Sequence, residues 1–472
     1  MTKLSEIIAS IVKKSSQSKK STKNEIDTSH SSEVDLKQEA RCVDTTDSTN
    51  KDEQSIKESL EKDEVIITEE FEKAFSLIKN KAPFLFITGR AGSGKSTFIN
   101  LLKERLKSYA VVAPTGVAAL NVGGQTIHSF FRLKPGPIEL DQIRQTRNRV
   151  AYQALDALII DEISMVRADL LDGIDRMLRL NGRDRNKPFG GVPIIAVGDL
   201  FQLPPIVTRD EEQAFLSRNY QSPFFFSANC MANVEIEKVE FNRVFRQKEE
   251  QFIDLLNCVR EGRKLESTLL ALNKNVSPRD QSENSGVILT ATNKVASHIN
   301  TAKLQLLQTQ PKSYIGEIRD DFRIDKEKLP APMTLILKLG AKVMFTKNDI
   351  KRRWVNGTVG EVVKLDDDRI KVEIEDNWGR RVVSVEMEIW KNFKFQYDAD
   401  KNSVVATEVG SYRQFPLTLA WALTVHKSQG KTFDKVHLDL GGSAFAEGQV
   451  YVALSRCRTL SGLSLELSLI HI

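Results

Sequence analysis

The stretch from Phe84 to Leu102 constrains the fold of this chain more than any other. It begins with an apolar, strand-like run from Phe84 to Ile87, continues through a glycine-rich turn, and ends in a segment whose apolar residues have helical spacing. The turn and the start of the helix match every fixed position of the pattern G-x-x-x-x-G-K-[ST]. A strand, a glycine-rich turn and a helix in this order predict a loop that binds the phosphates of a nucleotide.

Each part of this loop has a chemical reason. The glycines allow a backbone turn in which successive amide N–H groups converge on a phosphate at the positive end of the helix. Lys95 is predicted to reach the β and γ phosphates, and Ser96 to offer its hydroxyl to Mg²⁺. The residues predicted to bind a nucleoside triphosphate are Gly89, Ala91, Gly92, Ser93, Gly94, Lys95, Ser96 and Thr97.

Two further apolar strands end in polar side chains. The strand Ala157–Ile160 is followed by Asp161, predicted to hold Mg²⁺ through water, and by Glu162, predicted to polarise the attacking water; a surface acidic pair is the alternative. A third strand, Val192–Val197, leads to Gln202, which we interpret as a sensor of the γ phosphate. Alternating strands and helices predict a parallel sheet, so we expect all three motifs at one edge of it.

Length and composition set looser limits. A chain of 472 residues is long enough for about two to four domains, and its net charge of +5 does not by itself indicate nucleic-acid binding. The four cysteines include no C-x-x-C pair, which argues against a zinc site or a disulfide framework. No apolar run approaches the length of a membrane span, so we expect a soluble intracellular protein. Residues 1–63 lack aromatic side chains and are rich in Ser, Thr and charged residues, which predicts a disordered tail.

Several runs outside the phosphate loop carry a family resemblance. The most specific is Arg183–Pro205, and it is accompanied by Ala113–Ala119 and Thr126–Phe130. With these residues the chain, from about Glu64 to Leu467, resembles the PIF-one family of DNA helicases, in the superfamily-one branch that moves 5′ to 3′ on single strands. The resemblance implies that the nucleotide is ATP. Many members of the superfamily have an adenine-reading Gln before the loop, which this chain lacks at 68–71, so strict preference for ATP stays open.

The second half of the chain continues the resemblance. Phe241–Gln247 resembles the fourth helicase motif, Leu419–Thr432 the fifth and Gly448–Arg458 the sixth. The resemblance implies that Arg246 and Arg456 reach across a cleft between two domains to the γ phosphate. An arginine placed in this way contributes about 10³ to 10⁵ to the rate, so hydrolysis would depend on domain closure. A surface ion pair is the alternative for either arginine.

The resemblance also implies where DNA binds. Thr115 and His128 would contact a single strand on the first domain, and His426 and Ser428 on the second. Phe130 or the adjacent Phe131 would either stack on a base or belong to the core. The expected partners are single-stranded DNA and forked or 5′-tailed duplex DNA; we expect no membrane association and a monomer in solution.

The expected fold class is α/β, with two RecA-like parallel-sheet motor domains, a small inserted β-barrel and a disordered N-terminal tail. The first domain is placed at 64–238, with a strand-separating pin or wedge at about 132–150, and the second at 239–339 and 413–472. Short alternating runs divided by turn residues predict the barrel at 340–412.

We therefore expect an ATP-dependent DNA helicase, with ATP and Mg²⁺ as cofactors, that acts in DNA repair, recombination, replication or telomere-type maintenance. The expected location is the cytoplasm, with the nucleoid if the source is bacterial, or the nucleus or mitochondrion if it is eukaryotic. One alternative is a RecD-like helicase or conjugative relaxase, although a relaxase needs a histidine cluster and the 6 histidines here are scattered. Another is a DNA-stimulated ATPase that remodels DNA without processive unwinding.

Overall fold

The computed structural model describes residues 66–146, 149–207, 210–247, 249–274, 286–322, 329–376, 379–439 and 448–466. The expected tail at 1–63 lies outside these residues. The chain divides into two units, 1–66 and 67–472, and everything below concerns the second. Among the helices of the described residues, none is both long and apolar enough to cross a bilayer.

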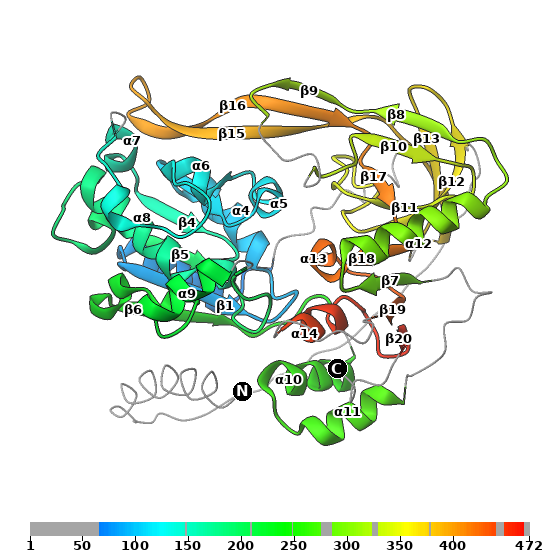
Figure 1. Ribbon diagram of the computed structural model, residues 1–472, viewed down its shortest axis with the longest axis horizontal. Helices are drawn as coiled ribbons and strands as arrows, with labels where there is room; N and C mark the ends of the chain where they lie inside the picture. Colours follow the sequence, from blue (N-terminus) through cyan, green and yellow to red (C-terminus); the bar gives the residue numbers. More distant parts are fainter. Residues whose placement is uncertain are drawn as a thin grey trace, which may run out of the picture. The chain divides into compact units, whose positions relative to one another are not determined.

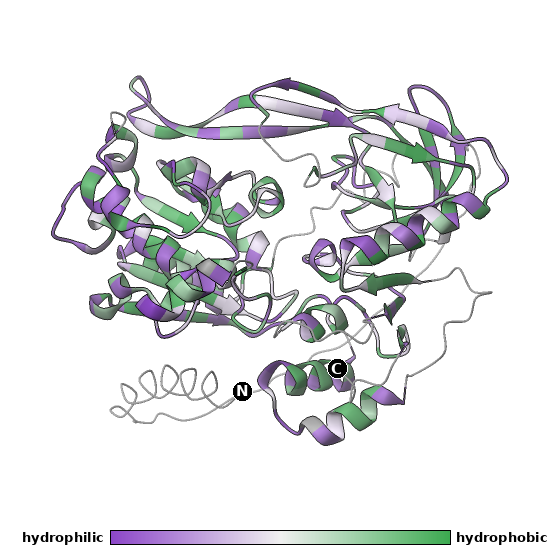
Figure 2. Ribbon diagram, viewed as in Figure 1, coloured by the Kyte–Doolittle hydropathy of each residue, from purple (hydrophilic) through white to green (hydrophobic). Residues whose placement is uncertain are grey.

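The first lobe is built on a six-stranded sheet in the order β3-β2-β4-β5-β1-β6, in which every strand pair is parallel. Figure 1 shows this sheet among its helices, and Figure 2 shows that its strands are largely hydrophobic. Its strands are β1 (Phe84–Gly89), β2 (Tyr109–Ala113), β3 (Gln125–Thr126), β4 (Ala157–Ile160), β5 (Ile194–Val197) and β6 (Ile236–Phe241). Its helices are α3 (Glu69–Lys79), α4 (Lys95–Arg105), α5 (Gly116–Asn121), α6 (Ile127–Phe131), α7 (Arg149–Gln153), α8 (Ala168–Asn181) and α9 (Asp210–Asn219).

Local sequence explains where the first helices begin. The side chain of Thr68 accepts a hydrogen bond from the backbone N of Phe71 and so caps α3. Strand β2 ends before Pro114, and Thr115 then caps α5 in the same way. These caps satisfy N–H groups that the first turn of a helix leaves without partners. Short polar residues therefore determine where these two helices begin.

The second lobe has a parallel four-stranded sheet in the order β18-β7-β19-β20. Two parallel sheets confirm the expected RecA-like α/β class. The strands are β7 (Val287–Thr290), β18 (Ala422–Thr424), β19 (Val436–Asp439) and β20 (Leu463–Leu465), and the helices are α10 (Glu250–Glu261), α11 (Leu265–Asn273), α12 (Asn293–Leu306), α13 (Val425–Ser428) and α14 (Gln449–Leu454).

The insertion comprises the strands from β8 to β17. Five of them form an antiparallel sheet in the linear order β14-β13-β12-β11-β17, and β8 pairs with β10. The four short strands that the sequence predicts here are present, but closure into a barrel stays a prediction. The strands are β8 (Lys312–Ile315), β10 (Thr334–Leu337), β11 (Lys342–Phe345), β12 (Val359–Leu365), β13 (Ile370–Asp376), β14 (Gly379–Val385) and β17 (Leu417–Leu419).

A long hairpin inside the insertion was not predicted. Its strands are β15 (Glu388–Asp398) and β16 (Ser403–Gln414), and β16 also pairs with β9 (Glu317–Asp320). Figure 1 shows the hairpin running from β9 to the neighbourhood of α7. Phe395 and Val404 are buried in the hydrophobic core of the first lobe, and the backbone N of Val404 donates to Ser108 Oγ at 2.9 Å. The hairpin therefore fastens the insertion to the first lobe.

Two expected boundaries can be compared with these elements. Strand β6 crosses the expected domain boundary at 238/239 and stays in the sheet of the first lobe through its pairing with β1. The expected pin segment packs against α8, where the backbone N of Ile138 donates to Asp169 Oδ2 at 2.9 Å and Ile143 is buried. Its base is thus fixed on the first lobe, while a strand-separating role stays a prediction.

Candidate functional site

The three polar motifs of the first lobe meet at one edge of its sheet. Strands β4, β5 and β1 are neighbours, and the register pairs Ile160 with Ala196 and Ile87 with Val197. Because the strands are parallel and end almost level, the residues that follow them lie close together. The shared edge that the sequence predicts is therefore confirmed.

The phosphate loop has the backbone geometry of an anion site. Gly92 and Gly94 have φ of +78° and +88°, which side chains rarely adopt. Gly94 caps α4 without a side-chain hydrogen bond, and the first turn of the helix holds no acidic residue. The first N–H groups of this helix are therefore available to an anion at its positive end.

Polar side chains complete this cradle. Lys95 Nζ donates to the carbonyl oxygens of Gly89 at 2.7 Å and Arg90 at 2.9 Å. Burial lowers the pKa of Lys95, while the charges of Asp199 and Glu162 oppose that shift. The Ser93 hydroxyl is buried and has no hydrogen-bond partner within the described residues. The Lys95 ammonium, the Ser93 hydroxyl and the first N–H groups of α4 are all hydrogen-bond donors, and such a set of donors suits a polyphosphate.

The acidic pair lies beside the loop. Burial is the main cause that raises the pKa of both Asp161 and Glu162; the charge of Asp161 raises that of Glu162 further, and Lys95 lowers both. Glu162 has φ of +51° and ψ of +45°, a left-handed conformation that is uncommon outside glycine and asparagine and is typical of functional sites. The pair belongs to the site, so the surface alternative does not hold.

A magnesium ion would find oxygen ligands here. Ser96 is exposed at the start of α4, and Asp161 offers a carboxylate, which are the donors that Mg²⁺ prefers. No group of three or more His, Cys, Asp or Glu side chains able to hold a metal occurs among the residues that the structure describes. The donor set therefore fits an ion that takes its remaining ligands from water and phosphate.

Arg246 and Arg456 both lie at this edge. The backbone N of Phe245 donates to Gly92 O at 2.9 Å, and a Cβ on Gly92 would lie 2.5 Å from that of Arg246. Arg456 is 1% exposed, and its guanidinium donates to Ser455 Oγ and to Lys431 O. Burial and the charge of Arg246 lower the pKa of Arg456, whereas Glu162 opposes that shift. Because the guanidinium of Arg456 is buried, the alternative of a surface ion pair does not hold for this residue.

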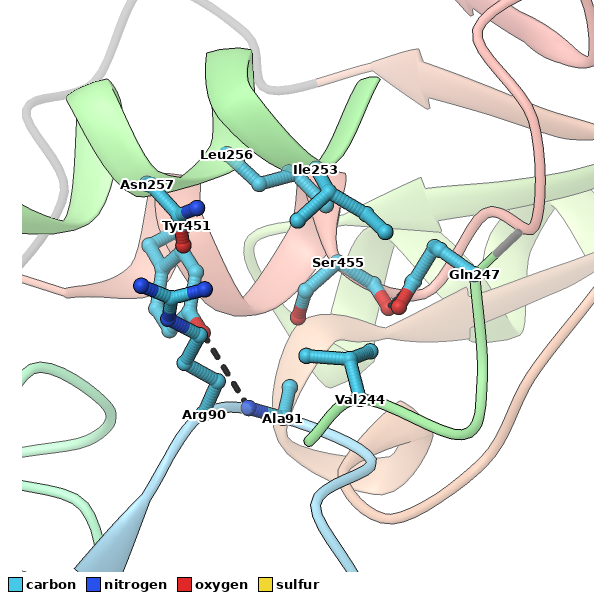
Figure 3. A pocket seen from close by; sticks show the side chains of 9 residues that line it. All are labelled: Arg90, Ala91, Val244, Gln247, Ile253, Leu256, Asn257, Tyr451 and Ser455. Atoms are coloured by element: carbon cyan, nitrogen blue, oxygen red, sulfur yellow. Dashed lines mark hydrogen bonds between the residues drawn. The ribbon is translucent and has the colours of Figure 1, made fainter. Parts of the chain in front are cut away.

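The second lobe also touches the loop through residues that the sequence analysis did not select. The Tyr451 hydroxyl, on α14, accepts a hydrogen bond from the backbone N of Ala91 at 3.2 Å. Near this contact, Gln247 Nε2 donates to the carbonyl oxygens of Ser455 and Cys457, both at 3.1 Å. Figure 3 shows Tyr451 and Ala91 joined by their hydrogen bond, beside Ser455 and Gln247 in the lining of the same pocket. The second lobe therefore contacts the backbone of the phosphate loop directly.

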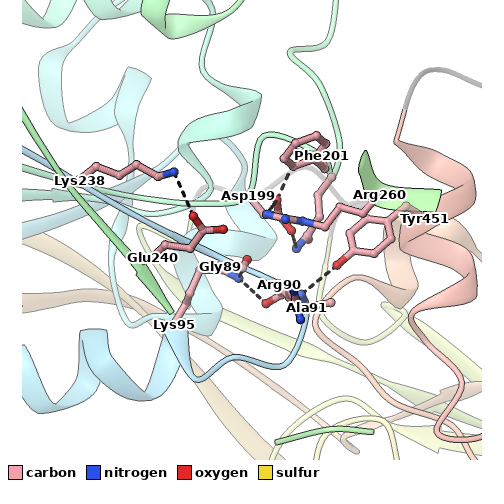
Figure 4. A network of polar contacts seen from close by, with 11 residues as sticks. Gly89, Arg90, Ala91, Lys95, Asp199, Phe201, Lys238, Glu240, Arg260 and Tyr451 are labelled. Carbon is pink, nitrogen blue, oxygen red and sulfur yellow. Dashed lines mark hydrogen bonds and ion pairs between the residues drawn. The ribbon is translucent and has the colours of Figure 1, made fainter. Parts of the chain in front are cut away.

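Asp199 and Arg260 form a second link between the two lobes, and it was not predicted from the sequence. Arg260 Nη2 lies 3.1 Å from Asp199 Oδ1 (Figure 4). Gln202 Nε2 donates to Asp199 Oδ2 at 3.1 Å. Gln202 is therefore at the predicted edge, but its amide is engaged by Asp199. A signal for Arg260 was available: it follows Phe252 and Leu256 at helical spacing on the buried stripe of α10.

Three of the four predicted DNA-contact residues keep exposed surface. The Thr115 hydroxyl accepts from the backbone N of Ala118, His128 is half-buried, and His426 is exposed. Burial lowers the pKa of both histidines. Neutral imidazoles suit hydrogen bonds to DNA rather than strong charge pairing with phosphate.

The prediction for Ser428 requires correction, and the alternative left open for Phe130 and Phe131 is decided in favour of the core. Ser428 is 0% exposed and its hydroxyl donates to Val425 O, so its side chain has no free surface for DNA. Phe130 and Phe131 are core residues: they pack edge to face with each other, and both contact Tyr152. The helical turn that carries each residue points its side chain inward, which motif position alone does not reveal.

Comparison with known proteins agrees with this geometry. Residues 64–268 match the family model of the PIF1-like helicase. The ATP-dependent DNA helicase Pif1 of Bdellovibrio bacteriovorus is 35% identical over 414 residues, which covers 85% of this chain and 88% of that protein. Human ATP-dependent DNA helicase PIF1 is also 35% identical. The match covers 81% of this chain but only 58% of the length of the human protein.

Among solved structures, unliganded Pif1 from Bacteroides sp matches with a TM-score of 0.78 at 39% identity, covering 86% of this chain and 93% of that one. The same Bacteroides protein has been solved in complex with ADP-AlF4, with a TM-score of 0.78, and bound to ssDNA, with a TM-score of 0.59. Identity at this level over most of both chains, together with the nucleotide site, establishes the family: the chain belongs to the PIF1-like helicases.

Proposed function

We propose that this chain is an ATP-dependent DNA helicase that moves 5′ to 3′ on single-stranded DNA and unwinds forked or 5′-tailed duplexes. The observation that carries the proposal is the position of Arg246 against Gly92 of the phosphate loop, together with the buried Arg456, whose charge acts on Arg246 and Glu162. The names of the Bdellovibrio and human relatives support it.

The roles of the side chains follow from their positions. Lys95 and the amides of the phosphate loop bind the triphosphate, while Ser96 and Asp161 hold Mg²⁺. Glu162 accepts a proton from the attacking water at its carboxylate, and Gln202 contacts the γ phosphate. Bound ATP supplies a phosphoanhydride bond whose hydrolysis is strongly favourable.

The two arginines make hydrolysis depend on the lobes. Arg246 and Arg456 stabilise the charge of the transition state only when the second lobe lies against the phosphate loop. The hydrogen bond between Tyr451 of the second lobe and Ala91 of the phosphate loop favours that closed arrangement. Closure and release of this contact, alternating with DNA grip on each lobe, would produce net stepping.

For DNA, we propose that Thr115 and His128 contact the strand on the first lobe and His426 contacts it on the second. The Bacteroides Pif1 structure bound to ssDNA supports a DNA-binding role for this fold. We propose a monomer in solution, although another Bacteroides structure concerns two coordinating Pif1 helicases at forked dsDNA. Light scattering with and without a fork tests the state of this chain.

The decisive experiment is an unwinding assay with matched 5′-tailed, 3′-tailed and blunt duplexes. We expect ATP-dependent strand separation of the 5′-tailed substrate alone. Unwinding of the 3′-tailed duplex would reverse the proposed direction. ATP hydrolysis stimulated by single-stranded DNA without unwinding of any substrate would favour the remodelling ATPase instead.

We predict that Lys95→Ala lowers ATP hydrolysis by about 10² to 10³ because it removes a charge that stabilises the transferred phosphate. It should leave most of the affinity for single-stranded DNA, since the phosphate loop and the proposed DNA contacts involve different residues. Steady-state hydrolysis and fluorescence anisotropy measure the two effects, with Lys73→Ala on the exposed side of α3 as the control. Hydrolysis at the parent rate in the Lys95 variant would remove the site assignment.

A further inference from the structure

A buried ion pair joins the two lobes outside the residues assigned to catalysis. Asp199 follows β5 in the first lobe and is 1% exposed, whereas Arg260 lies near the end of α10 and is 7% exposed. Their side chains meet at 3.1 Å, and the guanidinium of Arg260 lies 4.3 Å from the centre of the Phe201 ring (Figure 4). Asp199 and Phe201, which lie close in sequence to the proposed γ-phosphate sensor Gln202, therefore contact α10 directly through Arg260.

The carboxylate of Asp199 accepts hydrogen bonds from three donors. Its Oδ1 accepts from Arg260 and from the backbone N of Phe201, and its Oδ2 accepts from Gln202 Nε2 at 3.1 Å. A carboxylate buried this deeply is costly unless charged or polar donors surround it. Any turn of the Gln202 amide toward a γ phosphate therefore removes one donor from Asp199 and increases its dependence on Arg260.

Helix α10 belongs to the second lobe, because it packs against α11 and α14. Phe252 and Leu256 pack in one hydrophobic cluster with strands β7 and β19 and with α14, which carries Tyr451. Arg260 Nε is buried and has no hydrogen-bond partner among the described residues, so this arrangement does not satisfy the guanidinium completely. A buried donor without a partner calls for a specific explanation, and a second arrangement of this ion pair is the explanation that we pursue.

We propose that Arg260 is a positioning residue that couples the orientation of Gln202 to the placement of the second lobe, through the shared carboxylate of Asp199. The proposal rests on the proposed helicase function. Arg260 does not touch the reacting atoms; it makes the position of α10 depend on which partner Gln202 engages. DNA bound across both lobes then influences hydrolysis through this ion pair.

The test separates coupling from simple packing. We compare the full-length parent chain, Arg260→Gln, and the double variant Asp199→Asn with Arg260→Gln, in which no buried charge is left alone. The matched control is Arg179→Gln, which breaks an ion pair of 2.6 Å to Asp175 within α8 of the first lobe. For each protein we measure the melting temperature and the ratio of ATP hydrolysis rates with and without saturating oligo-dT.

We expect Arg260→Gln to lower this ratio at least tenfold and to lower the melting temperature. The double variant should regain the melting temperature but not the ratio, and Arg179→Gln should keep the parent ratio. A parent-like ratio in Arg260→Gln, or recovery of both quantities in the double variant, would overturn the inference. If Arg260→Gln does not fold, the ratio of hydrolysis rates in the double variant tests the inference instead. A parent-like ratio in that variant would overturn the inference. A parent ratio of one would refute the helicase proposal itself, and the inference with it.

Discussion

At the scale of single residues, the chemistry of this site depends on how deeply charges are buried. Arg456 is 1% exposed and adjoins a second arginine, so burial and repulsion both lower its pKa. The acidic side chain of Glu162 and a bound phosphate are the kinds of groups that would offset this cost. Two cations held together without a full complement of anions prepare the site for a highly charged substrate.

We predict that Arg246→Ala still binds ATP but hydrolyses it about 10³-fold more slowly, because the charge of the transition state loses one of its arginines. Single-turnover hydrolysis and binding of a fluorescent ATP analogue measure the two effects. Arg243→Ala is the control, since Arg243 is exposed and its guanidinium lies 5.2 Å from the Phe245 ring instead of at the phosphate loop. Equal rates in the two variants would contradict the assigned role.

At the scale of secondary-structure elements, the β15–β16 hairpin decides how the insertion is held. Phe395 is buried beside Tyr109 and Phe130 of the first lobe, with ring centres 6.3 Å and 6.2 Å away. The same strands carry Trp390 and Tyr412, which stack at 5.7 Å in a separate cluster. One hairpin therefore supplies side chains to two hydrophobic clusters.

We predict that Phe395→Ala lowers the free energy of unfolding by about 3–5 kcal/mol, because it leaves a cavity in the core of the first lobe. Phe393→Ala, on the same strand but only partly buried, should cost clearly less. Chemical denaturation of both variants measures the difference. Similar losses in both would mean that the hairpin does not anchor through Phe395.

An ion pair in the insertion gives a prediction about pH. Arg353 Nη2 lies 2.7 Å from Asp349 Oδ1, and hydrogen bonds from Arg353 are the main cause that lowers the pKa of Asp349. Since the folded pKa lies below the unfolded value of about 3.9, the stabilisation is present above that pH and disappears as the pH falls through the folded pKa.

We therefore expect Asp349→Asn to lower the free energy of unfolding by about 1–2 kcal/mol at pH 7, a modest value because Arg353 is partly exposed. The difference from the parent should shrink steadily below about pH 4. Urea denaturation at a series of pH values measures it. A difference that stays constant down to pH 2 would contradict the assigned ion pair.

At the scale of the whole described chain, the second lobe meets the first through backbone as well as side chains. Gly448, at the start of α14, has φ of +81°, and a Cβ there would lie 2.2 Å from the carbonyl oxygen of Gln202. A side chain at this position would separate α14 from the segment that carries Gln202, the proposed γ-phosphate sensor. Close approach of the lobes at this point therefore requires glycine.

We predict that Gly448→Ala lowers DNA-stimulated ATP hydrolysis at least about tenfold, which corresponds to a loss of about 1.4 kcal/mol in the stability of the closed arrangement. Gly262→Ala is the matched control, because Gly262 also has a positive φ, +65°, but a Cβ there would meet nothing within 4 Å. Both variants place an alanine at a positive φ, so the control accounts for that kind of backbone strain and the comparison tests the contact between the lobes. Equal hydrolysis in the two would show that this contact is unimportant.

The sequence by itself determined the local features of this protein. The phosphate loop, the strands that end in Asp161 and Gln202, the caps at Thr68 and Thr115, and the four short strands of the insertion all follow from residue type and spacing over a few positions. Such features depend on backbone conformations and hydrogen bonds within one or two turns of chain, so a local pattern is enough to predict them.

Only the tertiary structure decided which distant residues meet. Asp199 and Arg260 are 61 positions apart, and Ala91 and Tyr451 are 360 apart, and no local pattern specifies either contact. The same reason explains the error at Ser428 and the alternative left open at Phe130, because the burial of both residues depends on neighbours supplied by other elements. Burial and partner choice arise from packing over the whole chain, and these contacts are what link the nucleotide site to the second lobe.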